Sequence, residues 1–144
     1  MKLYTSYFYQ LRNFPSNLVG LSTAVWEPKY VLMGQRDDNG VLCIPCPPLK
    51  PGVECEGLCK GDCYIKHPNT CLFLQKYYEQ LSKINFDEFI EKLKTLANKI
   101  DNENNIDFAF MVYESPKKEC SERMMIRRWF NDNGLAIPEW TTPT

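Results

Sequence analysis

The chain has 144 residues, of which 44% are hydrophobic and 24% charged, and its formal net charge is −1. This length and composition are typical of a single globular domain with a full hydrophobic core. A net charge near zero excludes a surface coated with basic residues for general binding to nucleic acid or membranes. No apolar run resembles a signal peptide or is long enough to cross a bilayer, so we expect a cytoplasmic protein without a membrane partner.

Apolar patterning predicts six elements of regular secondary structure. In chain order they are strand, strand, helix, helix, strand and helix, over Lys2–Thr5, Asn17–Ala24, Cys71–Ile84, Asn85–Ile100, Ile106–Tyr113 and Cys120–Asn133. The second helix has apolar residues at the i, i+3, i+4 spacing, and Asn85 is a suitable N-cap with Glu88 three residues later. Leu135–Trp140 is expected to form a final edge strand, because Pro138 would disrupt an interior one.

The chain is organised around the last predicted strand and the helix that follows it. The strand over Ile106–Tyr113 is mostly apolar, as expected for a strand buried on both faces. In the helix, Ile126, Trp129 and Phe130 share the apolar face, and Arg123 is expected to lie largely off it. The two elements and the polar turn between them form a strand–loop–helix unit.

The order of these elements predicts an α/β fold. Strands that each lead into helical or irregular chain favour right-handed crossovers and a mainly parallel sheet. The carboxyl ends of parallel strands lie along one edge, where open α/β sheets bind their ligands. This arrangement would bring Ser6–Tyr9, Trp26–Tyr30 and Glu114–Arg123 together. Residues 1–144 are expected to form one domain.

Residues 34–71 have little periodicity and many cysteines and prolines, so we interpret them as an insert in that domain. Thiolates separated by two to four residues can bind one zinc ion, which would cross-link a stretch without a core of its own. The preferred ligands of this structural zinc are Cys55, Cys59, Cys63 and Cys71, and the substitutes are Cys43, Cys46 and His67. The alternatives are an iron–sulfur cluster, which also uses thiolates, and reduced cysteines buried in the loop.

The start of the last helix carries the candidate functional site. Free N–H groups at a helix amino terminus stabilise a thiolate and bind phosphate or carboxylate, so we expect a small-anion pocket at this turn. The predicted catalytic residues are Cys120 as nucleophile, Glu114 as general acid or base, and Arg123. Glu27 and Glu122 are further carboxylates expected at the same edge. The predicted ligand-binding residues are Ser6, Tyr7, Trp26, Ser121 and Arg123.

A purely structural interpretation of the same turn is also open. In it, Cys120 is buried, Ser121 caps the helix, and Glu122 pairs with Arg123 in solvent. A lone cysteine or arginine is more often structural than catalytic. The aromatic residues at the sheet edge could stack on a nucleobase, or could simply pack against the core and rim.

Several segments together resemble one known family. They are MKLYTSYF at the start, Trp-x-Pro at 26–28, VYESPKKECSER at 112–123, Asn-x-Asn-Gly at 131–134 and Glu-Trp at 139–140. The chain resembles the bacterial and phage family catalogued as domain of unknown function 488, which implies a small flavodoxin-like fold. Many members have Cys-His-Arg where this chain has Cys120-Ser121-Glu122-Arg123. Only Cys120 and Arg123 carry over, and an acid–base role of the family's histidine has no counterpart here.

Two functional hypotheses follow. The first is a small enzyme or binding protein whose anion pocket at the Cys120 turn takes a nucleotide or a nucleic-acid-derived ligand. The second is a non-catalytic, zinc-stabilised module that binds a protein or nucleic-acid partner. A cleft at the turn would favour the first hypothesis, and an open face would favour the second.

Overall fold

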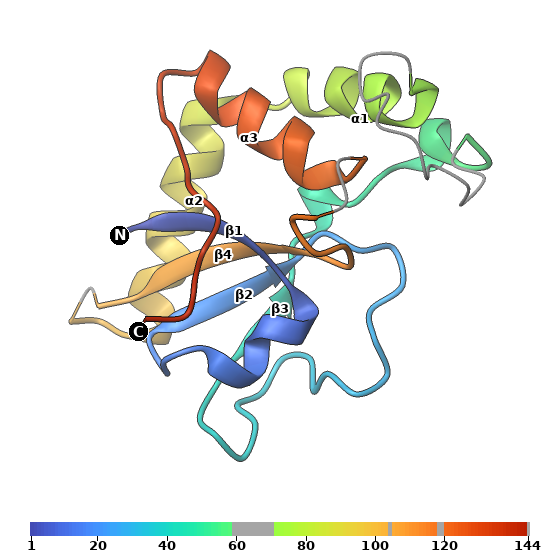
Figure 1. Ribbon diagram of the computed structural model, residues 1–144. Coiled ribbons are helices and arrows are strands. Elements are labelled where there is room, and N and C mark those ends of the chain that lie inside the picture. Colours follow the sequence, from blue (N-terminus) through green and yellow to red (C-terminus); the bar gives the residue numbers. More distant parts are fainter. Residues whose placement is uncertain (59–70, 104, 118–119, 144) are drawn as a thin grey trace.

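The computed structural model describes residues 1–58, 71–103, 105–117 and 120–143. Its centre is a four-stranded sheet in the order β1-β4-β2-β3, in which every pairing is parallel (Figure 1). The strands are β1 Leu3–Tyr7, β2 Leu18–Ser22, β3 Cys43–Pro45 and β4 Asp107–Val112. The predicted α/β class is confirmed, with a parallel sheet and flanking helices in a small domain of flavodoxin-like type.

The central strand is β4, formed by the apolar run that the sequence singles out. It pairs with β1 on one side and β2 on the other, so that Ala109 lies level with Tyr4 and Gly20. Successive side chains of a strand point to opposite faces. Accordingly, Phe110 packs into one hydrophobic core and Met111 into the other. Both faces of β4 are covered, which explains why the strand is apolar throughout.

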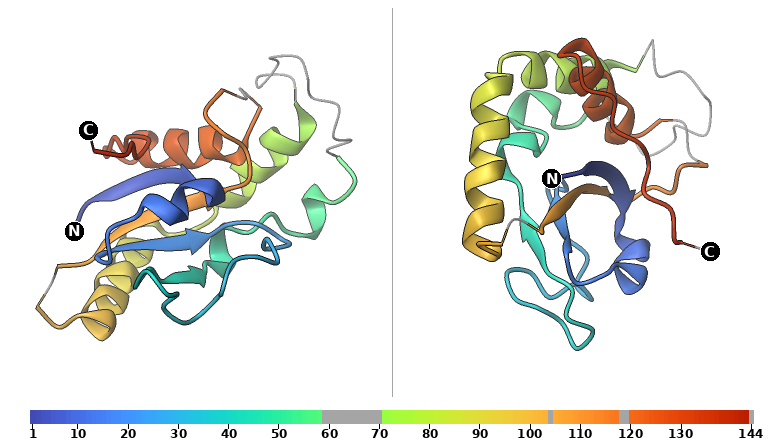
Figure 2. Two further views of the ribbon diagram at one scale, coloured as in Figure 1. Left: turned by 60° about the horizontal axis from the view of Figure 1, so that its bottom comes forward. Right: turned by 90° about the vertical axis from the view of Figure 1, so that its left-hand side faces the viewer.

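The three α-helices cover one face of the sheet and share its larger core (Figure 2). They are α1 Leu72–Ser82, α2 Phe86–Ile100 and α3 Glu122–Asp132. Helix α2 begins at its predicted cap, because Asn85 Oδ1 accepts a hydrogen bond from the Glu88 N–H at 3.1 Å. Its buried face carries Phe89, Leu93 and Ala97, at the spacing that the sequence predicts.

The opposite face is covered by the 3₁₀ helix η1, Phe8–Asn13, and by irregular chain that follows β2. These segments enclose a second, smaller core. Gly20 of β2 allows close packing here, since a Cβ at this position would lie 3.1 Å from both Cys43 Sγ and Leu11 Cδ2. The absence of a side chain therefore lets η1 and β3 approach the same point of the sheet.

Two parts of the chain differ from the sequence prediction. β3 is not among the predicted elements, and it lies inside the stretch assigned to an insert. Leu135–Trp140 makes one parallel bridge, between Glu139 and Thr5, instead of an edge strand. The Thr5 N–H donates to Pro138 O at 3.0 Å, and the Trp140 N–H donates to Thr5 O at 2.8 Å. This short contact places Glu139 beside the carboxyl half of β1.

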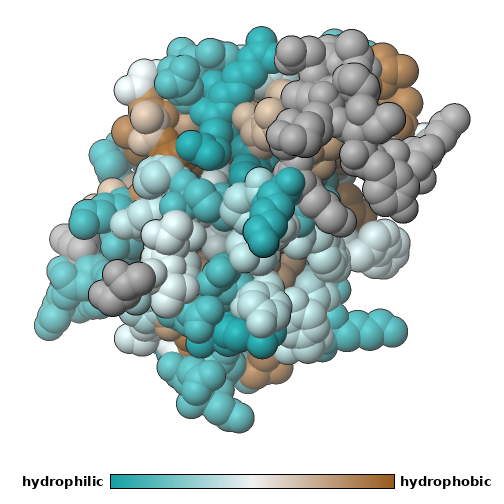
Figure 3. Space-filling model, in the orientation of Figure 1, coloured by the Kyte–Doolittle hydropathy of each residue, from teal (hydrophilic) through white to brown (hydrophobic). Residues whose placement is uncertain are grey.

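Within the described ranges, no helix is long and apolar enough to cross a membrane. The face of the molecule in Figure 3 is mainly hydrophilic, and its hydrophobic residues form small separate areas. Most of the large apolar side chains instead fill the two cores on either side of the sheet.

Candidate functional site

The carboxyl ends of β1, β2 and β4 meet, as a parallel sheet requires. The Tyr113 hydroxyl, just after β4, donates a hydrogen bond to the Trp26 carbonyl oxygen, which follows β2. The Phe8 ring, just after β1, packs edge-on against Tyr113 with ring centres 5.2 Å apart. The Arg123 guanidinium of α3 lies 5.8 Å from the centre of the Tyr7 ring. The predicted segments Ser6–Tyr9 and Glu114–Arg123 are therefore in contact, and Trp26 contacts Tyr113, the residue just before the second of them.

Ser121 is the N-cap of α3. Its Oγ accepts from the Arg123 N–H at 3.3 Å and donates to Glu114 Oε2 at 3.0 Å. These two contacts occupy the hydroxyl, so Ser121 has the capping role of the structural interpretation. Cys120 precedes the cap and is half-buried. Cys120 is therefore neither fully buried nor fully exposed.

Arg123 is buried, with only 4% of its surface exposed. Its Nε and Nη2 donate to Glu139 Oε1 and Oε2 at 2.6 and 3.1 Å, and Glu139 Oε1 also accepts from Thr5 Oγ1 at 2.7 Å. Nη1 is buried and has no hydrogen-bond partner among the described residues. The expected position off the apolar face is wrong. Arg123 precedes Ile126 by three residues and Phe130 by seven, which places it on their side of the helix.

Glu122 and Glu114 form a pair of carboxyl groups at the start of α3. The pKa of Glu122 is raised to about 7, mainly by burial and then by the charge of Glu114, with which it shares a hydrogen bond. The Arg123 charge acts in the opposite direction. A carboxyl group that titrates near neutral pH is suited to general acid–base chemistry. Among the carboxylates predicted at this edge, Glu122 has the environment that this chemistry requires.

The structure does not bring Ser6 to the same face as Arg123. In the parallel register Ser6 lies level with Met111 and Ser22. Met111 packs into the smaller core on the η1 side, and side chains level with one another in a sheet share a face. The Ser6 hydroxyl is buried there, with no partner among the described residues. Tyr7, one position later, lies on the α3 side beneath Arg123.

Trp26 lies at the outer rim of the edge, with 82% of its surface exposed. The residue after it, Glu27, pairs with Lys50, and this contact lowers the pKa of the Glu27 carboxyl. Glu27 is therefore held as a carboxylate by a cation, unlike Glu122. Trp26 is open to a ligand or a partner at this rim.

The predicted zinc ligands are described only in part, because Cys59, Cys63 and His67 lie outside the described residues. Cys55 is buried beside Gln80 in the last turns of α1, whereas Cys71 precedes the first turn. Nine helical residues span about 13 Å, so these two thiols lie toward different ends of α1. No group of three metal-ligating side chains occurs among the residues that the structure describes.

The two cysteines considered as substitute ligands are core residues. Cys43 packs on the η1 side of the sheet, and Cys46 packs on the α-helical side. Burial raises the pKa of each thiol to about 12, so both are neutral at physiological pH. None of the five described cysteines forms a disulfide. Cys43 and Cys46 thus pack in separate cores, on opposite sides of the sheet.

One important residue of this site, Glu139, is not among the predicted site residues, although it belongs to the Glu-Trp motif of the family resemblance. It comes sixteen residues after Arg123, in a segment expected only to extend the sheet. The signal that could have found it is the combination of a predicted edge strand beside β1 and a single carboxylate within it. Such a strand would place one carboxylate near the β1 terminus, where a buried arginine needs a partner.

Comparison of the chain with protein-family models, curated proteins and solved structures found no match. Any functional proposal therefore depends on the contacts of the residues that the structure describes. Membership of the domain of unknown function 488 family stays a prediction from the quoted motifs.

Proposed function

We propose that this protein binds a small oxyanion, such as a phosphate or carboxylate group, beside the amino terminus of α3. The observation that carries the proposal is the buried Nη1 of Arg123, which has no hydrogen-bond partner among the described residues. A buried donor left unpaired costs about 1–3 kcal/mol, and an oxyanion oxygen would offset that cost. Glu139 accepts hydrogen bonds from the other two guanidinium nitrogens, Nε and Nη2, so Arg123 is fixed in position before a ligand arrives.

The charges around Arg123 set the conditions for binding. The positive end of the α3 dipole favours an anion, whereas the carboxylates of Glu114 and Glu122 oppose one. Glu139 already offsets much of the Arg123 charge. Protonation of Glu122, whose pKa is about 7, removes part of the repulsion. We therefore propose a site that binds its anion more tightly on the acidic side of neutrality.

The enzymatic form of this proposal assigns a role to each residue of the turn. Cys120 would attack as a thiolate, with Glu114 or Glu122 moving the proton and Arg123 holding the anionic group. Tyr7 and Trp26 would contact a nucleotide or a nucleic-acid-derived substrate. The support is the Ser121–Glu114 hydrogen bond, which joins the residue after Cys120 to a carboxylate. On the basis of the family resemblance, we also propose that the protein is cytoplasmic and of bacterial or phage origin.

Phosphate binding tests the anion site. Titration calorimetry with inorganic phosphate and with AMP should give saturable binding, and Arg123→Ala should weaken it at least about ten-fold, because charge-assisted hydrogen bonds contribute roughly 1.5–3 kcal/mol. Arg128→Ala, at an exposed position of the same helix, is the matched control and should bind normally. Equal affinities of the two variants, or no binding by the unaltered protein, would show that there is no anion site here. Cys120→Ser should abolish turnover and spare binding if the thiolate attacks.

A structural zinc ion, held by the cysteines of residues 55–71, is a second proposal, and its support is their spacing. Elemental analysis of protein purified without added metal should find about one zinc per chain. Replacing Cys59 and Cys63 together by serine should remove the metal, whereas Cys43→Ser should leave it bound. Iron with acid-labile sulfide would favour the iron–sulfur alternative instead. A preparation that is folded yet free of both metals would rule out either site.

The alternative function is a non-catalytic interaction module. The observation that favours it is the exposure of large aromatic side chains at the sheet edge, Trp26 above all. Exposed aromatic residues commonly anchor protein and nucleic-acid interfaces. This alternative takes precedence if the protein binds no phosphate and Cys120→Ser has no effect on any activity.

A further inference from the structure

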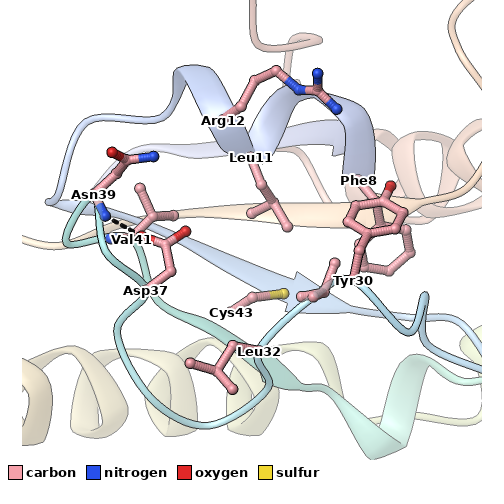
Figure 4. A pocket seen from close by; sticks show the side chains of 10 residues that line it. Phe8, Leu11, Arg12, Tyr30, Leu32, Asp37, Asn39, Val41 and Cys43 are labelled. Carbon is pink, nitrogen blue, oxygen red and sulfur yellow. Dashed lines mark hydrogen bonds between the residues drawn. The ribbon is translucent and has the colours of Figure 1, made fainter.

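A recess lies on the face of the sheet opposite the α-helices. It is a cavity of about 190 Å³ between η1 and the chain that leads into β3 (Figure 4). Leu11 and Cys43 face one another across it, with the Tyr30 ring at one end and Val41 at the other. It lies apart from the Cys120 turn, since Arg123 packs on the α-helical side. None of the roles proposed above for the anion site uses this cavity.

The floor of the cavity is apolar and uncharged. Phe8, Leu11 and Val41 are each less than a tenth exposed. Cys43 completes the floor, and burial raises the pKa of its thiol to about 12, so it carries no charge at neutral pH. An ion that reached this floor would lose its hydration without gaining a partner there, since the charged lining residues Arg12 and Asp37 stand at the wall and rim. The floor therefore suits an uncharged part of a ligand.

The rim is held in place by hydrogen bonds before any ligand binds. Asp37 Oδ1 accepts from the backbone N–H groups of Asn39 and Val41 at 2.8 and 3.0 Å, which closes a tight turn. Arg36 Nη1 donates to Ser16 O at 2.9 Å and to Gly40 O at 2.6 Å, tying this turn to the segment after η1. A recess with such a wall is formed in advance, which lowers the entropic cost of binding.

One aromatic residue in the wall of the cavity, Tyr30, is exposed to solvent. Tyr30 is 70% exposed although its ring borders the cavity. Arg12 lies over the Tyr9 ring at 3.7 Å and reaches the same rim, and Asn39 stands at the opposite end. A flat ring inserted beside Tyr30 would cover apolar surface on both partners. The polar edge of that ring would meet the donors and acceptors of the rim.

We propose that this cavity binds a neutral heteroaromatic ring of one or two cycles, of the nucleobase class. The volume of about 190 Å³ admits one such ring. The apolar floor suits the faces of a base, whereas Arg12 and Asn39 suit its hydrogen-bonding edge. Because the base itself is neutral, this proposal does not depend on an anion at Arg123.

Adenosine, which has no phosphate, separates this cavity from the anion site. Titration of ¹⁵N-labelled protein with adenosine should shift the amide resonances of Phe8, Leu11 and Val41 in a saturable way, and ribose at the same concentration should not. Tyr30→Ala should weaken adenosine binding at least about five-fold, the loss expected when a base loses its aromatic partner. Tyr30→Phe should retain most of the affinity, because the ring and not the hydroxyl makes the contact.

Val53→Ala is the control, since Val53 is an exposed apolar residue that does not line the cavity and has no role in the anion site. It should bind adenosine as the unaltered protein does. The proposal is overturned if adenosine causes no saturable shifts, if ribose causes the same shifts, or if Val53→Ala loses affinity and Tyr30→Ala does not. Phosphate binding by Arg123 can fail without affecting any of these outcomes.

Discussion

Replacing Arg123 by alanine is expected to lower the free energy of unfolding by about 3–5 kcal/mol, the cost of breaking a buried ion pair. The Arg123 side chain is 5% exposed and that of Glu139 is 15% exposed. Their two hydrogen bonds, at 2.6 and 3.1 Å, are the bidentate geometry that makes such pairs strong. Without the guanidinium, Glu139 would keep the Thr5 hydroxyl as its described partner. Urea unfolding at neutral pH measures the loss.

The same helix provides a control with the same chemical change. Arg128 is exposed and lies 3.9 Å from Asp132, so Arg128→Ala should cost only about 0–1 kcal/mol. In the double variant Arg123→Ala/Glu139→Gln, the cost should be smaller than the sum of the two single costs, because each single variant leaves one buried charge unpaired and the double variant leaves none. If Arg123→Ala costs no more than Arg128→Ala, the pair contributes nothing to stability and Arg123 is not a fixed anchor.

The stability of the protein is expected to fall by about 2–3 kcal/mol as the pH rises from about 4.5 to about 7, through the titration of Glu122. Burial and then Glu114 raise the pKa of Glu122 from 4.5 to about 7 in the folded protein. In this window the folded state binds the proton and the unfolded state does not. The free energy of unfolding therefore falls with each pH unit until Glu122 is ionised in the folded protein as well. The stabilisation from protonated Glu122 is complete below about pH 4.5 and is lost above about pH 7.

The charged and titratable groups that interact with Glu122 come from several elements. Glu114 and Arg123 act on it directly. Burial raises the pKa of Cys55 and of Tyr77, and the Glu122 charge adds a smaller rise to each. Glu122→Gln should flatten the pH profile and make the variant the more stable protein at pH 8. Glu91→Gln, at an exposed position on α2, should leave the profile unchanged. A pH profile identical in the unaltered protein and Glu122→Gln would contradict the raised pKa.

The sequence predicts those parts of the fold whose signal is local. The apolar runs of β1, β2 and β4 and the periodicity of α2 each appear within one short window. The sequence does not predict β3, because this strand has three residues, ends at Pro45 and is followed by further prolines. A strand this short is specified by pairing with β2 and not by its own pattern.

The sequence predicts which chain segments follow the strands, but not how their side chains are arranged. The contacts of Tyr7 with Arg123 and of Trp26 with Tyr113 both follow from the parallel topology, which brings the carboxyl ends of the strands to one edge. The burial of Arg123 could not be read from its charge, because it depends on Glu139, brought in by a segment without a strong pattern. The placement of Ser6 on the opposite face depends on register, and a shift of one residue reverses every side chain of a strand.

The position of β4 also governs how the chain can fold as it is made. β1 and β2 are not neighbours in the sheet, and each pairs with β4, which the ribosome delivers last of the strands. The contact between Lys2 and Asp107 joins residues 105 positions apart. Sheets closed over such separations form slowly, since the loop must close before the pairing can offset its entropy. For most of its synthesis the nascent chain therefore carries β1 without a strand partner and β2 with only the three-residue β3 to pair with, a state in which association with other chains competes with folding.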